Sequence, residues 1–116
     1  MDFTNLSPYF NQIDLIKDAA NQLIKDFELF GLEIKFSGNA YNAYEELFEQ
    51  VEPRINKLIS TNQQKFMNIL YRIDLSETQI KKALEDSNEP FSAVVSDLII
   101  KRELQKVVIR KYFKKS

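Results

Sequence analysis

Three glutamates near the middle of the chain have the residue type and the spacing for carboxylate chemistry. Glu45, Glu49 and Glu52 follow one another at steps of four and three, which places them on one face of a helix. Helical proteins that hold two metal ions combine such glutamates with Glu-x-x-His pairs, and this sequence contains no histidine. We therefore expect a water-exposed acidic face here, and neither a metal nor another cofactor.

Other residue types that catalysis commonly uses are also missing. The sequence has no cysteine for thiol chemistry, and its two glycines, Gly31 and Gly38, are too few for a phosphate-binding loop. Ser7, Thr61 and Ser76 stand where helix caps are expected, and no base is available to activate a hydroxyl group. We expect the protein not to be an enzyme.

Basic residues gather at the C-terminal end of the chain. Residues 101–116 contain seven basic residues and one acidic residue, Glu103, for a net charge of +6, so the first 100 residues contribute −7 to the overall −1. On a helix, Lys106, Arg110 and Lys114 would form one stripe, which we expect to be exposed. The candidate partner-binding residues are Lys106, Arg110, Lys111, Lys114 and Lys115.

The basic stripe has two interpretations. Cations near a helix C-terminus interact favourably with the helix macrodipole, and their long stems can cover apolar surface. Alternatively, the stripe docks on an acidic protein, a nucleic acid or an anionic membrane surface. Nucleic acid is disfavoured because the chain is acidic overall, with a pI of about 5.5. A membrane surface is disfavoured because the core needs the apolar face of the helix.

The segment 70–74, with the sequence LYRID, mixes charged and bulky residues. Pairing of Arg72 with a carboxylate, or with carbonyl groups, would fix the corner between two helices, and a recognition edge is the alternative. Together with the segment 98–106, LIIKRELQK, it resembles a family of small uncharacterised helical proteins from bacteria, over residues 47–113. The resemblance implies an all-helical domain and no known activity.

The apolar pattern predicts the elements that carry these residues. From a serine cap at Ser7 followed by Pro8, apolar residues recur at steps of three and four as far as Phe30, and Gly31 is the expected helix terminator. The alternating segment 32–36 is expected to be an extended linker whose apolar face packs on helices, because the chain offers it no partner strand. A strand that pairs across a dimer is the alternative.

Two further helices follow the linker. The helix expected over about 41–60 contains Pro53, which either kinks it or separates two short helices. Thr61 then begins a capping-box pattern, and a third helix follows with Phe66 and Ile73 on its apolar side.

Two more helices complete the chain. Ser76 and Gln79 form the clearest capping box in the sequence and predict a short helix over 77–85. The last helix is expected from about 90 to 112, and it is apolar over so much of its circumference that it should be central.

These segments predict one all-α domain over residues 1–116, a single-domain bundle of four to six helices with a central C-terminal helix and an extended linker near 32–36. The expected core includes Ile13, Ile16, Leu23, Phe27, Leu47, Val51, Phe66, Ile69, Leu70, Ile80, Leu84, Leu98 and Ile99.

Neither a signal-peptide pattern nor a run of about 18 apolar residues is present, so we expect no membrane insertion and a cytoplasmic location. The expected function is a non-catalytic helical protein-interaction or structural module, self-associating or bound to a protein partner, with no small-molecule ligand. One alternative is a nucleic-acid or anionic-surface binder that uses the basic C-terminal helix. A further alternative is an enzyme that relies on carboxylates or lysine.

Overall fold

Five α-helices and one short 3-10 turn make up the described part of the chain. The structure, a computed structural model, describes residues 12–113, and these contain no β-strand. The fold is therefore all-α, with a helix number inside the predicted range of four to six. The elements are α1 (Ile13–Glu28), η2 (Ala40–Asn42), α2 (Ala43–Thr61), α3 (Gln63–Ile73), α4 (Glu77–Glu85) and α5 (Phe91–Tyr112).

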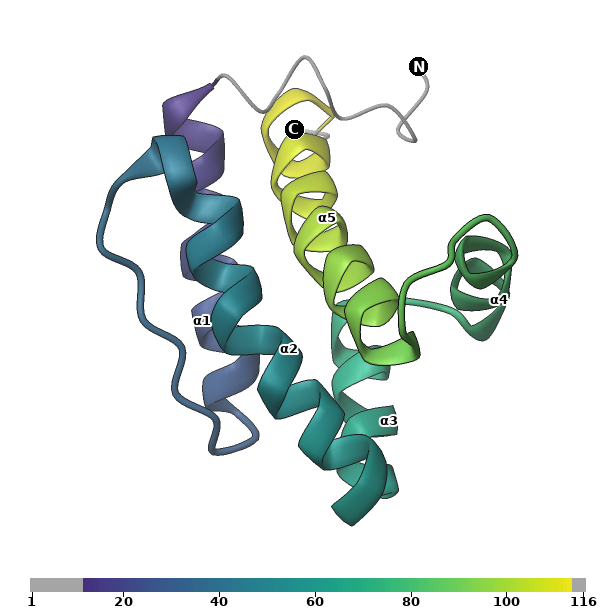
Figure 1. The fold of residues 1–116 in the computed structure, drawn as a ribbon. Helices are drawn as coiled ribbons and strands as arrows, with labels where there is room; N and C mark the ends of the chain where they lie inside the picture. The colour runs from purple at the N-terminus through teal and green to yellow at the C-terminus, as the bar shows by residue number, and fades with distance from the viewer. Residues whose placement is uncertain (1–11, 114–116) are drawn as a thin grey trace.

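Helix α5 is the central element, as its sequence predicts. It contacts α1, α2, α3 and α4, and Figure 1 shows it running between the α1–α2 side of the molecule and α4. An α-helix with neighbours on several sides must be apolar around most of its circumference. The buried side chains of α5 accordingly occur on several of its faces, and they are Ser92, Val94, Val95, Ser96, Ile99, Ile100, Glu103, Leu104, Val107 and Val108.

Helix α1 buries the predicted Leu23 and Phe27, but its N-terminal part lies against α5 with a different face from the one predicted. The predicted start at Ser7 and Pro8 lies outside the described residues, and the predicted core residue Ile13 is exposed. Instead, Leu15 and Ala19 pack on Leu104, Val107 and Val108 of α5. This contact rotates the buried face of α1 away from Ile13.

Of the other predicted core residues, most are buried and three are partly buried. The buried ones are Leu23, Phe27, Leu47, Val51, Phe66, Ile69, Leu70, Ile80 and Ile99, and the partly buried ones are Ile16, Leu84 and Leu98.

Gly31 ends the first helical segment, as predicted. Its φ of +74° is left-handed, a conformation that costs glycine little. The Leu32 N–H donates to the Phe27 carbonyl at 3.1 Å and the Gly31 N–H donates to the Glu28 carbonyl at 3.0 Å. These two bonds form a Schellman motif, which satisfies the last carbonyl groups of α1 and turns the chain back along it.

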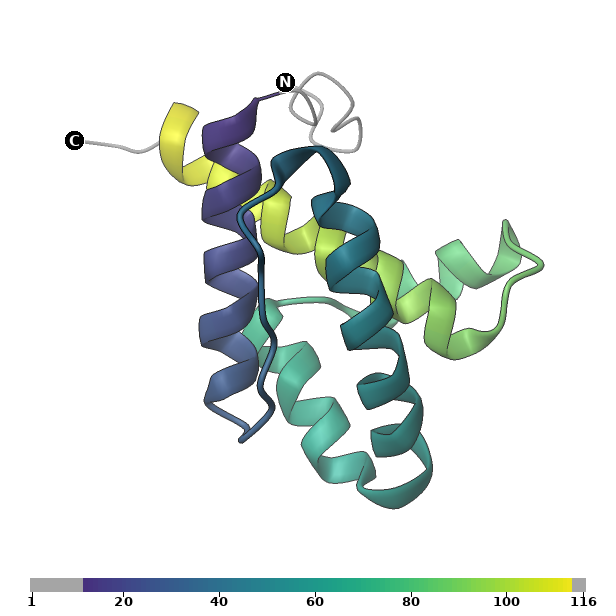
Figure 2. The ribbon, with the colours of Figure 1, turned by 60° about the vertical axis from the view of Figure 1, so that its left-hand side comes forward.

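The segment 32–36 is the extended linker that its alternation predicts. Ile34 is buried, and Leu32 and Phe36 pack partly buried against the same core. Gln50 of α2 takes the place of a partner strand: the Lys35 N–H donates to Gln50 Oε1 at 2.9 Å, and Gln50 Nε2 donates to the Lys35 carbonyl at 2.7 Å. Figure 2 shows this segment running along the outside of the α1–α2 pair, in front of the space between the two helices.

Helix α2 continues through Pro53, so the chain does not divide into two short helices there. The predicted capping role of Thr61 is wrong, because its hydroxyl donates to the Lys57 carbonyl at 2.6 Å and so belongs to the end of α2. Asn62 caps α3 instead, accepting from the Lys65 N–H at 3.1 Å.

The capping box before α4 is confirmed, with the Ser76 N–H donating to Gln79 Oε1 at 2.9 Å and the Gln79 N–H donating to Ser76 Oγ at 3.2 Å. Helix α4 has the predicted bounds, and α5 begins and ends where expected. None of the helices described is both long and apolar enough to cross a membrane.

Candidate functional site

Lys106, predicted to be part of an exposed stripe, points into the protein. Its side chain is 19% exposed, and Nζ lies 2.9 Å from Asp26 Oδ2 and 2.7 Å from Glu103 Oε1. Because α5 is central, the face that carries Lys106 is covered by α1. The prediction of one exposed stripe through Lys106 and Arg110 is therefore wrong at its first member.

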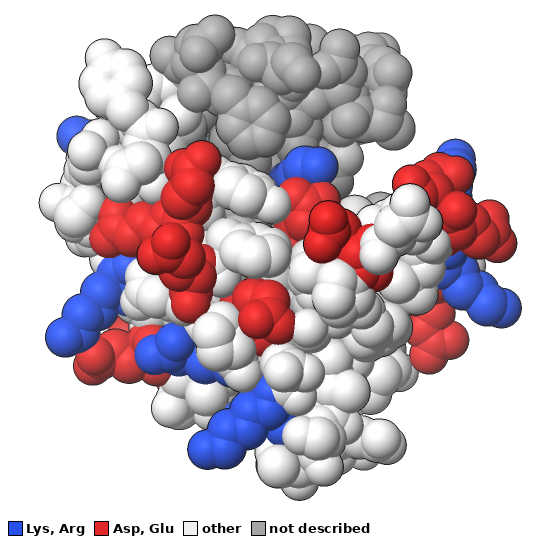
Figure 3. Space-filling model, viewed as in Figure 1, with Lys and Arg blue, Asp and Glu red and all other residues white. Residues whose placement is uncertain are grey.

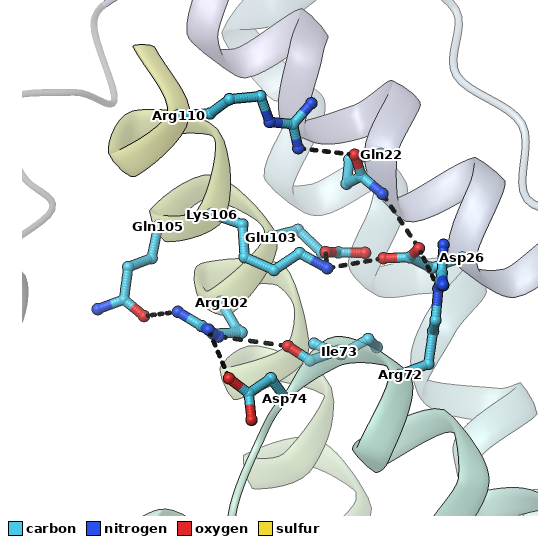
Figure 4. Close-up of polar contacts among 10 residues, drawn as sticks. All are labelled: Gln22, Asp26, Arg72, Ile73, Asp74, Arg102, Glu103, Gln105, Lys106 and Arg110. Atoms are coloured by element: carbon cyan, nitrogen blue, oxygen red, sulfur yellow. Dashed lines mark hydrogen bonds and ion pairs between the residues drawn. The ribbon is translucent and has the colours of Figure 1, made fainter. Parts of the chain in front are cut away.

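Asp26 of α1 is the hub of this buried polar cluster. It is 1% exposed, and its carboxylate accepts from Gln22 Nε2 at 3.1 Å, Arg72 Nε at 3.1 Å and Lys106 Nζ at 2.9 Å. Figure 4 shows side chains from α1, α3 and α5 converging on it. Burial alone would raise the pKa of Asp26, but the neighbouring Glu103, Lys106 and Arg72 side chains outweigh burial and hold this pKa below its ordinary value.

Glu103 of α5 faces Asp26 and is equally buried, at 1% exposed. Burial and the neighbouring Asp26 carboxylate raise the pKa of Glu103 to about 8, although Lys106 opposes the shift. The shared environment thus lowers the pKa of Asp26 and raises the pKa of Glu103.

Arg102, and not the predicted Arg72, fixes the corner between α3 and α4. Arg72 does pair with a carboxylate, but the carboxylate is Asp26 of α1. Arg102 Nε donates to the Ile73 carbonyl at 3.3 Å and its Nη2 donates to Asp74 at 3.2 Å. Asp74 occupies the left-handed turn after α3, with a φ of 64°, so Arg102 ties α5 to that turn.

An open groove of about 820 Å³ separates the outer faces of α1 and α5. It contains two of the predicted partner-binding residues, Arg110 and Lys111, whereas Lys114 and Lys115 lie outside the described residues. Arg110 Nη2 donates to Gln22 Oε1 at 2.9 Å, and Gln22 in turn donates to Asp26. The lining residues are Asp14, Lys17, Asp18, Asn21, Gln22, Lys25, Val107, Arg110 and Lys111.

A second, smaller hollow of about 300 Å³ lies among α2, α4 and α5. The Tyr44 hydroxyl donates to Asp97 at 2.5 Å, and the Tyr44 ring stacks on Phe48 with centroids 5.8 Å apart. Lys101 Nζ lies 2.9 Å from the same carboxylate of Asp97. Burial and the Asp97 carboxylate raise the pKa of Tyr44, so this phenol stays protonated and acts as a hydrogen-bond donor.

The predicted acidic face of α2 is only partly exposed. Glu45 and Glu49 are exposed, but Glu52 accepts from Ser92 Oγ of α5 at 2.6 Å. Figure 3 shows acidic side chains gathered over the N-terminal half of α2. Within residues 12–113, no group of three or more acidic side chains could hold a metal ion.

Asp26 and Glu103 were not among the site residues predicted from the sequence, although the sequence carries a signal for both. Asp26 is three residues beyond Leu23 on the buried face of α1, and Glu103 lies four residues from both Ile99 and Val107. A charged residue at a helical position that is otherwise apolar is a candidate for a buried, paired charge. Neither residue lines either of the two hollows described above, so the cluster lies in the interior, between α1, α3 and α5.

Comparisons of this chain with protein-family models, with curated proteins and with solved structures find no match.

Proposed function

We propose that this protein is a non-catalytic interaction module and that it binds an acidic segment of a partner protein in the groove between α1 and α5. The observation that carries the proposal is the composition of the groove. Four cationic side chains line it, Lys17, Lys25, Arg110 and Lys111, against the two acidic side chains of Asp14 and Asp18.

The mixed charges favour a protein partner over nucleic acid. A phosphate backbone presents a dense, unbroken row of negative charge, and Asp14 and Asp18 would repel it within the same groove. A peptide that carries separate carboxylates can place them against Lys17, Lys25, Arg110 and Lys111 while avoiding both aspartates. Arg110 is suited to a carboxylate because its planar guanidinium group can bind both oxygens at once.

The groove also has a rigid base. Val107 is buried at its floor, and the Arg110–Gln22–Asp26 chain of hydrogen bonds anchors one wall to the interior cluster. A preformed surface loses less conformational entropy when a partner binds.

The test compares wild-type protein with a double variant, Lys17→Glu with Lys111→Glu. Both lysines are exposed, and in the described structure neither forms an ion pair with a carboxylate. Fluorescence anisotropy measures binding of a labelled peptide that alternates glutamate and alanine, with a glutamine version of the peptide as its neutral control. The matched control protein is Lys81→Glu with Lys82→Glu on α4, which makes the same charge change away from the groove.

We expect the acidic peptide to bind wild type and the α4 variant alike, to bind the groove variant at least tenfold more weakly, and to lose affinity as salt is added. Equal weakening in both variants would show that only net charge matters. Tighter binding of a duplex DNA oligonucleotide than of the peptide would favour the alternative of a nucleic-acid binder.

A further inference from the structure

Asp26 and Glu103 differ in the number of donors that reach them. Asp26 accepts from three side chains, Gln22, Arg72 and Lys106, as expected of an ionised carboxylate. Glu103 contacts one cation, Lys106, whose Nζ lies 2.7 Å from Oε1, and no described residue forms a well-aligned hydrogen bond with either Glu103 oxygen. An ionised carboxylate oxygen without a donor in a dry interior is strongly unfavourable.

A proton on Glu103 removes this difficulty. Figure 4 shows the two carboxyl groups directed toward one another, so a protonated Glu103 can donate to Asp26 while Lys106 spans both groups. We propose that Asp26 and Glu103 form a buried proton-binding site, in which Glu103 carries the proton and donates it in a hydrogen bond to an ionised Asp26.

The surrounding cations pair with Asp26 more fully than with Glu103. Helix α1 contributes Asp26, α3 contributes Arg72, and α5 contributes Lys106 and Glu103 itself. Arg72 is half exposed and reaches Asp26 only, so it does not neutralise Glu103. Arg102 of α5 is directed to Asp74, and no charged side chain of α2 or α4 in the described residues contacts Glu103. Among the described residues, Lys106 is therefore the one cation in contact with Glu103, and it is shared with Asp26, which also has Arg72.

The proton site links binding of a proton to contact between α1 and α5. Asp26 and Glu103 come from these two helices, so separating the helices exposes both carboxyl groups to water and releases the proton at neutral pH. The same two helices line the groove, and Gln22 belongs both to the groove and to the cluster.

Infrared spectroscopy tests the proposal directly, because a protonated carboxylic acid has a carbonyl stretching band that a carboxylate lacks. At pH 6.5 we expect wild type to show one such band, and Glu103→Gln to lack it. The control Glu85→Gln removes an exposed glutamate on α4 and should leave the band unchanged. A band that persists in Glu103→Gln, or no band in wild type, would overturn the proposal.

A second measurement needs no variant and so does not depend on the folding of Glu103→Gln. The ¹³C chemical shift of the Glu103 side-chain carboxyl group, followed by NMR in wild type, should titrate with a midpoint near 8. A midpoint at or below the ordinary glutamate value of 4.5 would show that Glu103 is ionised at neutral pH and would overturn the assignment of the proton.

Discussion

Lys106 and Arg110 lie one helical turn apart on α5 and have different environments. Lys106 is held between two buried carboxylates, whereas Arg110 is exposed and bonded to the neutral Gln22. We expect Lys106→Gln to lower the free energy of unfolding by about 3–5 kcal/mol, because it leaves buried Asp26 with only the half-exposed Arg72 as a cation and Glu103 with none. Arg110→Gln should lower it by less than about 1 kcal/mol.

Urea unfolding of the two variants at neutral pH measures this difference. Equal, small losses of stability would mean that the interior contact of Lys106 is not formed in solution. We expect Lys106→Gln to unfold at a lower urea concentration than wild type, and Arg110→Gln to unfold at nearly the wild-type concentration.

Gly31 gives a prediction about backbone conformation alone. Its φ is +74°, and an added Cβ would have no atom within 4 Å, so a side chain meets no steric obstacle there. Gly31→Ala should therefore lower the free energy of unfolding by about 1 kcal/mol through backbone strain only. Thermal unfolding checks this, and a variant as stable as wild type would contradict the left-handed turn after α1.

At the scale of the elements, the central position of α5 is tested by two neighbouring residues. Ile99 is completely buried, whereas Leu98 is only partly buried at the edge of the core. Ile99→Ala should lower the free energy of unfolding by about 2–5 kcal/mol, and Leu98→Ala by a smaller amount. The opposite order of the two losses, measured by urea unfolding, would mean that α5 is rotated from the orientation described.

The linker 32–36 depends on one side chain of α2. Gln50→Ala removes both hydrogen bonds to the Lys35 backbone and should lower the free energy of unfolding by about 1–2 kcal/mol. The Lys35 amide should also exchange with solvent much faster in hydrogen-exchange NMR. Gln64→Ala, which removes an exposed bond to Asn68, is the control, and unchanged Lys35 exchange in Gln50→Ala would contradict the described contact.

Local patterns predicted the elements better than their orientations. The bounds of α4 followed from Ser76 and Gln79, because a capping box depends on residues three apart in the chain. Which of Ile13 and Leu15 is buried depends on how α1 is rotated against α5, and no local rule contains that information. The candidate site was predicted least well for this reason, since the sequence does not show that Lys106 is mostly buried and Arg110 exposed.

At the scale of the whole molecule, Glu103 should make stability fall as pH rises. Folding raises its pKa from 4.5 to about 8, so between these values the folded chain keeps a proton that the unfolded chain has lost. The free energy of unfolding should therefore fall by roughly 1.4 kcal/mol per pH unit between about pH 5 and pH 8. Below the ordinary pKa of Asp26 the sign reverses, because folding lowers that pKa and acid removes the stability it contributes.

Urea unfolding from about pH 2 to pH 9 measures the fall in stability above pH 5 and the reversed slope below the ordinary Asp26 pKa of 3.8. In Glu103→Gln the loss between pH 5 and pH 8 should disappear. Wild-type stability that stays level or rises over that interval would contradict the raised pKa of Glu103.

The proposed function depends on where an acidic partner meets the surface. Cations also occur outside the groove, on α4 as Lys81 and Lys82, and the affinity of a peptide does not by itself distinguish these positions. A map of the contact is therefore more direct than a binding constant.

Amide NMR of labelled wild-type protein, titrated with the alternating glutamate–alanine peptide, gives that map. We expect the shifted amide signals to lie along residues 14–25 of α1 and 107–111 of α5, the two walls of the groove, with signals of α3 and α4 unchanged. Shifts centred on α4, or spread evenly over every basic residue, would contradict the proposal that the α1–α5 groove is the binding surface.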